Sequence, residues 1–527
     1  MDGEQQVPNL FPRESYLSRI RPFYDSDLIK VITGIRRCGK SSLLLTIMDE
    51  LRSRGVQDTH IVYLNLDSRR HRGIRDADAL DEAVESLMPE GGMRYLFIDE
   101  VQNVPDYEVV VNGWREEGDV SVFITGSNSY LLSGELMTKL TGRYIEFEMY
   151  TLDFAEWLGM RRHFGLPEHS NGIEALEEYL TYSGFPKVLE FSTPDAKQAY
   201  VREVVSQIIE KDIRKDNRGR VRVRNLDVFE RILTYVVNNY GATTNAKNIA
   251  DHFTNVEDFP LRRDTVKRYL DVMENAKLIC KCTRFDLKTR RSLGAQEKYY
   301  LSDIGIYFAR NTDNRIDYGP ALENILYTYL RARGYQLSIG KIGKLECDFI
   351  CRKNNGYAYI QVAASIVDRK VEDREYEPFH HIRDSYPRYV LTLDPLPLRR
   401  EGVTHLNMVN FMVEGAELVE QRGSTQLRLR QRDGGPTDSS GGQNGGQSGG
   451  QSGGQNGGDA MTGSPADQRG NFVLKAISNN PRATAREIAD DLGISKRTVE
   501  RTIKALRECG LISRKGGARG AWQVKAE

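Results

Sequence analysis

Residues 33–42 read TGIRRCGKSS, and this stretch matches the pattern G-x-x-x-x-G-K-[ST] in full. A largely apolar run, 28–32, precedes it, and a second run, 43–47, follows it. The stretch therefore joins a predicted strand to a predicted helix. Gly34 and Gly39 permit backbone angles and close approach that a Cβ would forbid. Because the N–H groups of such a loop and of the following helix point at a phosphate chain, we predict a phosphate-binding loop here.

Two side chains of the loop carry the expected chemistry. Lys40 can reach the β- and γ-phosphates of a nucleotide, and the Ser41 hydroxyl can bind Mg²⁺. A nucleotide with Mg²⁺ is therefore the predicted ligand. The residues expected to surround the nucleotide are Gly34, Ile35, Arg36, Arg37, Cys38, Gly39, Lys40, Ser41 and Ser42.

A second signature begins some 60 residues later. The apolar run 95–98 is followed at once by Asp99 and Glu100. A carboxylate at the carboxyl end of a strand beside the phosphate loop can hold Mg²⁺, which is the role expected for Asp99. Glu100 is then the candidate for polarising the attacking water.

Two further positions are candidates for the same site. The strand predicted at 121–126 ends in polar residues, and the Ser127 hydroxyl is placed to contact the γ-phosphate or the attacking water. Arg143 is a candidate for stabilising transition-state charge on its own nucleotide or on that of a neighbouring subunit. The alternative for Arg143 is an ordinary surface arginine.

Four stretches together resemble a known family: ITGIRRCGKSSLL, YLFIDEVQNV, FITGSNSYLLSGELMTKLTGRY and YTLDFAEWL. They are similar to prokaryotic AAA-type P-loop ATPases that carry a restriction-endonuclease-like domain of unknown function towards the carboxyl end. The resemblance covers roughly residues 10–415. It implies ATP binding and hydrolysis, with Lys40, Ser41, Asp99 and Glu100 on the motif positions of the family.

At 527 residues the chain is too long for one core, and we predict an α/β multidomain protein. The expected parts are an AAA-type P-loop ATPase domain with a parallel sheet (1–155), a helical lid (156–225), a winged helix (226–310), a restriction-endonuclease-like α/β domain (311–420), a disordered Gly/Gln/Ser linker (421–470) and a winged helix-turn-helix (471–527).

The restriction-endonuclease-like segment departs from an active nuclease pattern. Glu323, Asp348 and Gln361 follow the order of a metal-dependent nuclease site, with Ala363 at the position of the lysine. An amide is a poor Mg²⁺ ligand, and alanine can neither move a proton nor stabilise charge. We therefore expect a degenerate site in which nuclease activity is disfavoured.

The carboxyl-terminal module is basic within a chain whose net charge is zero. Residues 471–527 hold 12 Lys and Arg against 6 Asp and Glu, which is a net charge of +6. A capping box at Thr484–Glu487 opens one helix, and Ser495 begins the predicted recognition helix. DNA is the expected partner, and a protein-interaction role is the alternative. The predicted DNA contacts are Lys496, Arg497, Arg501, Lys504, Arg514, Lys515 and Arg519.

Composition narrows the class of protein. Apolar content of 39% and charged content of 28% are typical of a globular protein, and no apolar run is long enough to span a membrane. Six cysteines and the polar amino-terminal residues favour a cytoplasmic location. A homo-oligomer is compatible with the sequence.

These observations favour an ATPase that couples nucleotide state to DNA binding. The alternatives are a nucleotide-gated DNA-binding regulator with little turnover and an ATP-regulated nuclease of a defence system or mobile element.

Overall fold

The structure is a computed structural model. It describes residues 9–126, 140, 142–214, 222–312, 315–395, 399–419 and, near the carboxyl end, 484–487, 496, 499, 500, 503, 507, 512–515 and 521–524. The chain divides into two compact units, Met1–Ser424 and Thr425–Glu527. The linker predicted at 421–470 lies outside the described residues. Among the helices that the structure describes, none combines the length and apolar character needed to cross a membrane.

The amino-terminal part of the first unit is a five-stranded parallel sheet with the order β2-β3-β4-β1-β5. Its strands are short apolar runs, as expected for a parallel sheet that is covered on both faces. They are β1 (Ile29–Gly34), β2 (Ile61–Asn65), β3 (Arg94–Asp99), β4 (Val120–Gly126) and β5 (Tyr144–Met149). This confirms the predicted parallel sheet and places β4 between β1 and β3.

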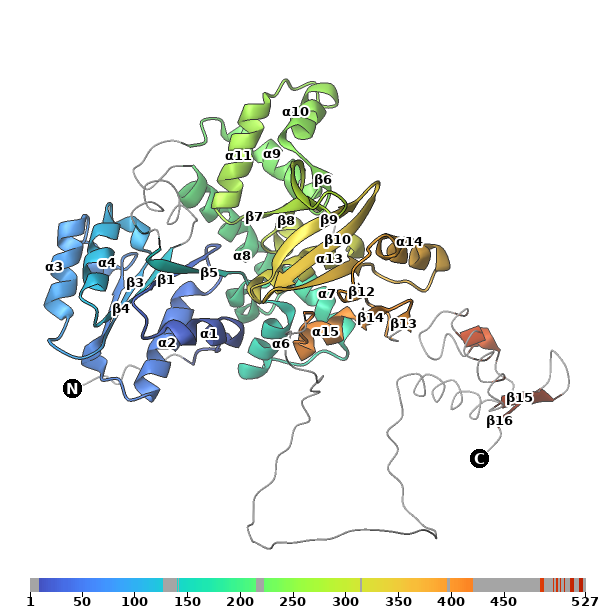
Figure 1. Cartoon of the computed structure of the whole chain (residues 1–527), viewed down its shortest axis with the longest axis horizontal. Coiled ribbons are helices and arrows are strands. Elements are labelled where there is room, and N and C mark those ends of the chain that lie inside the picture. Colours follow the sequence, from blue (N-terminus) through green and yellow to red (C-terminus); the bar gives the residue numbers. More distant parts are fainter. Residues whose placement is uncertain are drawn as a thin grey trace, which may run out of the picture. The chain divides into compact units, whose positions relative to one another are not determined.

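Helices cover both faces of this sheet (Figure 1). One face packs against α3 (Ala77–Leu87) and α4 (Tyr107–Glu116). The other packs against α1 (Glu14–Ile20) and α2 (Lys40–Ser53). Because parallel strands all end at one edge, the residues that follow β1, β3 and β4 meet there, which is where ligands bind in open α/β sheets.

Residues 154–213, most of which fall in the segment predicted as a helical lid (156–225), contain a run of helices. The elements are α6 (Phe154–His163), α7 (Gly172–Tyr182), α8 (Pro194–Gln207) and a π-helix, η7 (Ile208–Ile213), that continues α8. Asp153 opens α6 with a complete capping box to Glu156.

A nine-stranded sheet runs through the rest of the unit, in the order β13-β14-β12-β11-β10-β9-β7-β8-β6. Its strands are β6 (Thr243–Thr244), β7 (Ile279–Asp286), β8 (Arg291–Leu301), β9 (Gln336–Ile342), β10 (Leu345–Lys353), β11 (Gly356–Val362), β12 (Arg388–Thr392), β13 (Arg399–Arg400) and β14 (Val403–Asn407). The accompanying helices are α9 (Leu226–Asn238), α10 (Ala246–Asn255), α11 (Arg263–Asn275), α12 (Gly305–Arg310), α13 (Tyr318–Ala332), α14 (Arg369–His380) and α15 (Met408–Glu414).

The three helices and the hairpin predicted within 226–310 are present as α9, α10, α11 and β7–β8. The predicted boundary at 310/311, however, cuts one continuous sheet. Arg284 to Asp286 of β7 pair in parallel with Ile339 to Lys341 of β9, so the hairpin and the following α/β segment share backbone hydrogen bonds. Because β7 and β9 are far apart in the sequence, their pairing leaves no signal in the residue pattern of either strand.

In the second unit the described residues match the predicted module. Thr484 N donates to Glu487 Oε2 at 2.7 Å and Glu487 N donates to Thr484 Oγ1 at 3.3 Å, which completes the capping box. Val499 and Ile503, within the predicted recognition helix that Ser495 begins, are buried. The wing is the antiparallel pair β15 (Ile512–Lys515) and β16 (Ala521–Val524).

The central strand β1 buries a lysine. Lys30 is 0% exposed, its Nζ donates to Ser121 Oγ at 2.6 Å and to the Ser26 carbonyl at 3.1 Å, and it lies 4.6 Å from the Phe123 ring centroid. Burial lowers the pKa of Lys30 to about 7, because the charged form loses its hydration.

This pKa predicts a pH dependence of stability. Above pH 7 the folded chain releases the Lys30 proton, whereas the unfolded chain keeps it to about pH 10.4. The unfolded state therefore binds more protons between these values, so Lys30 makes the free energy of unfolding rise with pH, by at most about 1.4 kcal/mol per pH unit. We expect Lys30→Met to remove this contribution.

The measurement compares thermal unfolding midpoints at pH 7, 8 and 9. The unfolding midpoint of wild type minus that of Lys30→Met should rise steadily from pH 7 to pH 9. Lys370→Met, at an exposed lysine, is the matched control and should follow wild type. A difference that stays constant with pH would contradict the burial argument.

Candidate nucleotide-binding site

The loop between β1 and α2 adopts a backbone conformation that requires glycine at particular positions. Gly34 has φ +153°, and a Cβ there would lie 2.2 Å from the Met149 carbonyl oxygen. Gly39 has φ +103° and Arg37 has φ 69°. These left-handed conformations fold 35–39 into a compact turn ahead of α2. The two glycines of the motif are thus required by close approach and by backbone angle.

Lys40 lies within this turn. It is 5% exposed, and its Nζ donates to the carbonyls of Gly34 at 3.0 Å and Ile35 at 3.3 Å. Ser41 is half-buried and Ser42 is exposed in the first turn of α2. The ammonium, the Ser41 hydroxyl and the positive end of the helix dipole therefore share one small region.

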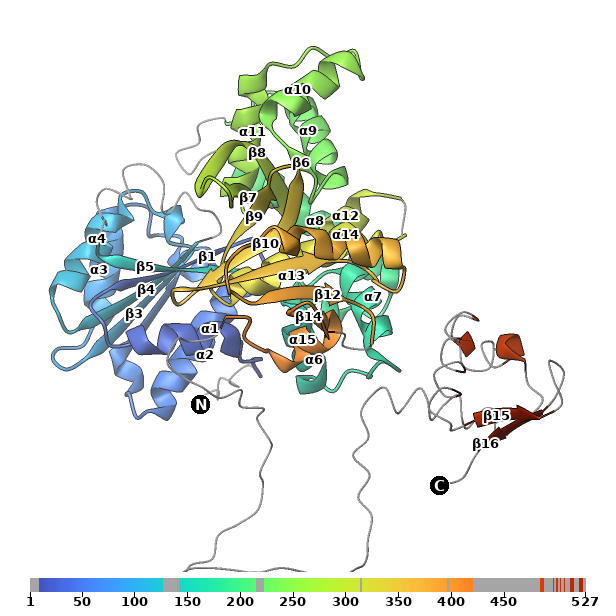
Figure 2. The same ribbon diagram turned by 45° about the vertical axis from the view of Figure 1, so that its right-hand side comes forward.

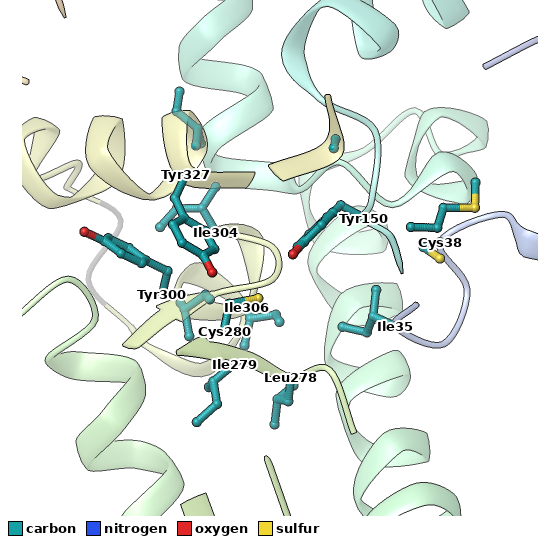
Figure 3. Close-up of a cluster of buried hydrophobic side chains, with 14 of the residues drawn as sticks. Ile35, Cys38, Tyr150, Leu278, Ile279, Cys280, Tyr300, Ile304, Ile306 and Tyr327 are labelled. Atoms are coloured by element: carbon teal, nitrogen blue, oxygen red, sulfur yellow. The ribbon is translucent and has the colours of Figure 1, made fainter. Parts of the chain in front are cut away.

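The base of the loop is part of the main core. Ile35 and Cys38 are buried in the cluster that also holds Tyr150, Cys280 and Tyr327 (Figure 3). Burial raises the pKa of the Cys38 thiol, so this cysteine packs rather than reacts.

The buried side chain of Arg13 holds the phosphate loop in place. Arg13 Nη1 donates to the carbonyls of Cys38 at 3.0 Å and Tyr150 at 2.9 Å. Its Nη2 donates to the Thr151 carbonyl at 3.0 Å and to Glu156 Oε2 at 2.6 Å. The guanidinium thus joins the phosphate loop to the end of β5 and the start of α6. Nothing in the local sequence around Arg13 signals this contact.

Asp99 ends β3 at the same edge of the sheet and is fully buried. Its Oδ1 accepts a hydrogen bond from Thr125 Oγ1, and its Oδ2 accepts from Tyr63 OH at 3.1 Å and Asn65 Nδ2 at 3.2 Å. Both oxygens are therefore oriented by residues of β2 and β4. The three donors were not predicted, although each lies at or near the end of a predicted strand.

Glu100 follows in a left-handed conformation, with φ 56° and ψ 45°. Its backbone N–H donates to Thr125 Oγ1 at 3.1 Å, and its carboxylate accepts from Gln102 Nε2. Left-handed backbone at a non-glycine residue is uncommon and gathers at functional sites. Thr125 thus positions both acids at once.

Arg36 ties the loop to a distant helix. Its Nε and Nη2 donate to the two carboxylate oxygens of Asp212, each at 3.0 Å, and both side chains are largely buried. Asp212 lies in the π-helix η7, and π-helical turns often occur at functional positions. A bidentate pair fixes orientation as well as distance, so loop and helix are rigidly linked.

Of the two remaining predicted site residues, the structure describes only Arg143, and it does not lie beside the loop. Ser127 is outside the described residues. Arg143 precedes β5, where Tyr144 pairs with Ile29 at the start of β1. Gly34 is at the opposite edge, roughly 17 Å away at about 3.3 Å per residue. Arg143 instead donates to Asn112 Oδ1 at 3.0 Å and lies 3.6 Å from Glu116.

The residues of the suspected nuclease site do converge, around a lysine that was not predicted. Lys298 Nζ lies 3.0 Å from Glu323 Oε2 and 2.9 Å from Glu346 Oε1. Asp348 Oδ2 accepts from Val362 N at 2.8 Å, and burial together with nearby Glu323 raises its pKa well above the usual range.

The amide at 361 completes this cluster. Gln361 Oε1 accepts from Asp348 N at 2.7 Å, and its Nε2 donates to Glu375 Oε2 at 2.8 Å. Among the described residues, no group of three or more Asp, Glu, His or Cys is arranged to hold a metal ion. The degenerate nuclease site stays a prediction.

Of the predicted DNA contacts, Lys496 is exposed on its helix, and Arg514 and Lys515 lie on β15. The side chains of Arg514 and Lys515, and residues Arg497, Arg501, Lys504 and Arg519, are outside what the structure describes.

Comparison with protein families matches three segments. Residues 26–158 match the AAA domain, 173–315 match a domain of unknown function, and 473–513 match the winged helix-turn-helix DNA-binding family.

Similar solved structures include the Aeropyrum pernix ORC2 protein (12% identity, TM-score 0.31, covering 62% of this chain and 96% of that one). The Thermotoga maritima RuvB Holliday junction branch migration motor is another (14% identity, TM-score 0.28, covering 51% and 89%).

Two curated relatives are both described as uncharacterized proteins. One, from Methanocaldococcus jannaschii, is 27% identical over 335 residues, which are 61% of this chain and 71% of the relative. The other, from Haemophilus influenzae, is 33% identical over 385 residues, which are 73% of this chain and 93% of the relative. The chain therefore carries an AAA domain and belongs to the same family as this Haemophilus influenzae protein.

Proposed function

We propose that this protein is a Mg²⁺-dependent ATPase whose nucleotide state controls its engagement of DNA. The observation that carries the proposal is the convergence of Lys40, Asp99 and Glu100 at one edge of the parallel sheet. β1, β4 and β3 are adjacent, so the phosphate loop, Thr125 and the two acids follow neighbouring strands.

The residues present fit a nucleotide with its metal ion. The turn at 34–39 packs so closely on β5 that a Cβ at Gly34 would lie 2.2 Å from the Met149 carbonyl oxygen, and Lys40 supplies the cation for the β- and γ-phosphates. Ser41 and Asp99 would hold Mg²⁺, which neutralises charge on the phosphates when bound. Because both Asp99 oxygens already accept hydrogen bonds, we expect Asp99 to act through water.

Glu100 is the group that would accept a proton from the attacking water. It is half-buried, it follows the buried Asp99, and its carboxylate is oriented by Gln102. Thr125 fixes the backbone that presents it. The reaction class is therefore phosphoryl transfer to water, with Lys40 stabilising charge on the phosphates.

Control of DNA engagement is supported by two features. The basic module at 471–527 matches a DNA-binding family. Within the first unit, the pair Arg36–Asp212 links the phosphate loop to η7 and so gives the loop a rigid connection beyond the AAA domain. A regulator that binds ATP but barely hydrolyses it would share these features, and turnover distinguishes the two.

The first test is the Glu100→Gln variant. We expect its kcat for ATP to fall by about 10²- to 10⁴-fold while ATP still binds, because general-base catalysis contributes about this much. Lys40→Ala should weaken ATP binding itself. Glu85→Gln, at an exposed carboxylate of α3, is the matched control and should retain turnover. Wild-type protein that binds ATP without measurable turnover, alone or with duplex DNA, would favour the regulator.

The role of Thr125 gives a second prediction. Thr125→Val removes the hydroxyl that bonds Asp99 and the Glu100 backbone while keeping the side-chain shape. Hydrogen bonds to charged groups contribute about 1.5–3 kcal/mol, so we expect kcat to fall roughly 10- to 100-fold with little change in KM. Thr125→Ser keeps the hydroxyl and should restore most of the activity. Equal losses in both variants would contradict the positioning role.

DNA binding is tested at Lys496, which is exposed on the predicted recognition helix. In the full chain, Lys496→Ala should weaken binding to duplex DNA and lower the slope of log affinity against log salt by about 1, because one phosphate contact is lost. Lys370→Ala in the first unit should leave both quantities unchanged. Nucleotide control predicts that duplex affinity differs between ATP and ADP, and that Lys40→Ala removes this difference.

A further inference from the structure

A groove of about 1040 Å³ lies on the nine-stranded sheet, away from the nucleotide site. Three segments form its rim: the turn between β7 and β8 (285–290), the turn between β9 and β10 (342–345), and the end of α14 with the residues that follow it (380–386). Residues of β10 and β11, among them Tyr357, line it as well. The strands and α14 that frame it lie side by side in both overall views (Figures 1 and 2). None of its lining residues belongs to the cluster around Lys298.

The floor of the groove is aromatic. Tyr357 and Tyr386 are half-buried, with ring centroids 5.2 Å apart and an interplanar angle of 57°. Phe285 and Leu287 extend this surface from the β7–β8 turn, and both are also half-buried. These side chains pack on the core beneath them, so their positions are set by the sheet.

The rim of the groove is cationic. Lys288, Arg290, Lys344 and Arg383 are all exposed and come from all three lining segments. In the part of the chain that the structure describes, none of these four forms an ion pair with a carboxylate. The Arg352 guanidinium lies 5.9 Å from the Tyr357 ring centroid and adds a further positive charge beside the floor.

The carboxylates of Asp384 and Asp286, beside the groove, already accept hydrogen bonds. Asp384 accepts from Tyr359 OH at 2.6 Å and from Tyr386 N at 3.1 Å. Asp286 accepts from the backbone N–H groups of Lys288 and Thr289, at 2.9 Å and 3.0 Å. Both carboxylates therefore stabilise the turns that carry the cations and the tyrosine.

The two histidines of the lining have acidic partners. His380 Nδ1 lies 3.3 Å from Glu401, and His381 Nε2 lies 3.1 Å from Glu377. The excess charge of the groove thus comes from the lysines and arginines, and the ligand that complements it is anionic.

From this arrangement we infer that the groove binds single-stranded nucleic acid, with bases against Tyr357 and Tyr386 and phosphates along the cationic rim. Aromatic faces flanked by lysine and arginine are the combination that proteins use for single strands, because every base has a face to stack and every nucleotide a phosphate. Bases in a duplex are stacked on one another and cannot reach such a floor.

This inference adds a second nucleic-acid site to the proposed function and does not depend on hydrolysis. The two can fail separately. ATP turnover reports on the Lys40 site, duplex affinity reports on the Lys496 module, and single-strand affinity reports on the groove.

The test uses the full chain and fluorescein-labelled 12-nucleotide oligomers of thymidine and of uridine, with a duplex of equal length for comparison. Tyr357→Leu and Tyr386→Leu keep apolar volume but remove the stacking face, and each should weaken single-strand binding roughly 5- to 100-fold. The double variant Lys288→Ala/Lys344→Ala should reduce the slope of log affinity against log salt by about 1.4, for two lost contacts. Duplex affinity should be unchanged in all three.

The control is Lys187→Ala/Lys370→Ala, which removes two exposed lysines elsewhere in the same unit and should bind single strands as wild type does. Weakening in the lysine variant alone, with both tyrosine variants unaffected, would overturn the inference, since it indicates a surface for any polyanion. Equal losses for duplex and single strand would also overturn it. A loss confined to thymidine or to uridine oligomers supports it and assigns the strand as DNA or RNA.

A second measurement is independent of the variants' folding. Ultraviolet cross-linking of wild-type protein to an oligomer bearing 5-iodouracil should attach it to peptides containing Tyr357 or Tyr386. An excess of free thymidine monophosphate should compete poorly. It offers one base and one phosphate, whereas the groove has several aromatic side chains for bases and several cationic side chains for phosphates. Cross-links found only in peptides of 471–527 would overturn the inference while leaving the proposed function intact.

Discussion

The contact on which the nucleotide site depends is the buried guanidinium of Arg13. It bonds three carbonyls and Glu156, and Glu156 is also the residue that completes the capping box of α6. One charge therefore fixes the phosphate loop, the end of β5 and the entry to the helical segment together. Removing either partner of such a buried pair leaves an uncompensated charge and typically costs about 3–5 kcal/mol. The geometry of the loop is thus set as much by residue 13 as by the glycines of the motif.

The loop is also coupled to parts of the chain that the motif does not include. Ile35 and Cys38 pack into the same core as Cys280, Tyr300 and Tyr327 (Figure 3). Arg36 is held by Asp212, which lies in η7, outside the parallel sheet. Close-packed cores transmit displacement rather than absorb it. A change in the loop on binding phosphate would therefore displace residues of η7 and of the core beneath the nine-stranded sheet.

Local patterns were sufficient to predict most helices and strands, because apolar period and capping residues act over a few positions. They predicted Gly34, Lys40 and Asp99 as a group, since each belongs to a motif with a mechanism. Local patterns could not predict Thr125 as the partner of Asp99, because that contact follows from strand order, or Arg13 as the partner of Cys38, because that contact joins parts of the chain that are distant in the sequence. The same holds for Arg143: only the parallel pairing of β5 with β1 places it at the end of the sheet away from the loop, where it contacts Asn112 and Glu116. The continuous sheet across 310/311 likewise follows from the pairing of β7 with β9.

The carboxylates of the cluster around Lys298 are held by ion pairs and hydrogen bonds within the chain. In a metal-dependent nuclease the carboxylates hold a divalent cation and a lysine acts on the water. Here the Lys298 ammonium lies between Glu323 and Glu346, at 3.0 Å and 2.9 Å, and supplies the positive charge that these carboxylates need when buried. Asp348 is bonded to backbone and Gln361 to Glu375, so their polar atoms have internal partners. A divalent cation would have to displace a buried ammonium held by two ion pairs. We therefore propose that the phosphate chemistry of this chain lies at Lys40 and Glu100. The strands β10 and β11, which carry Asp348 and Gln361, also carry part of the groove lining.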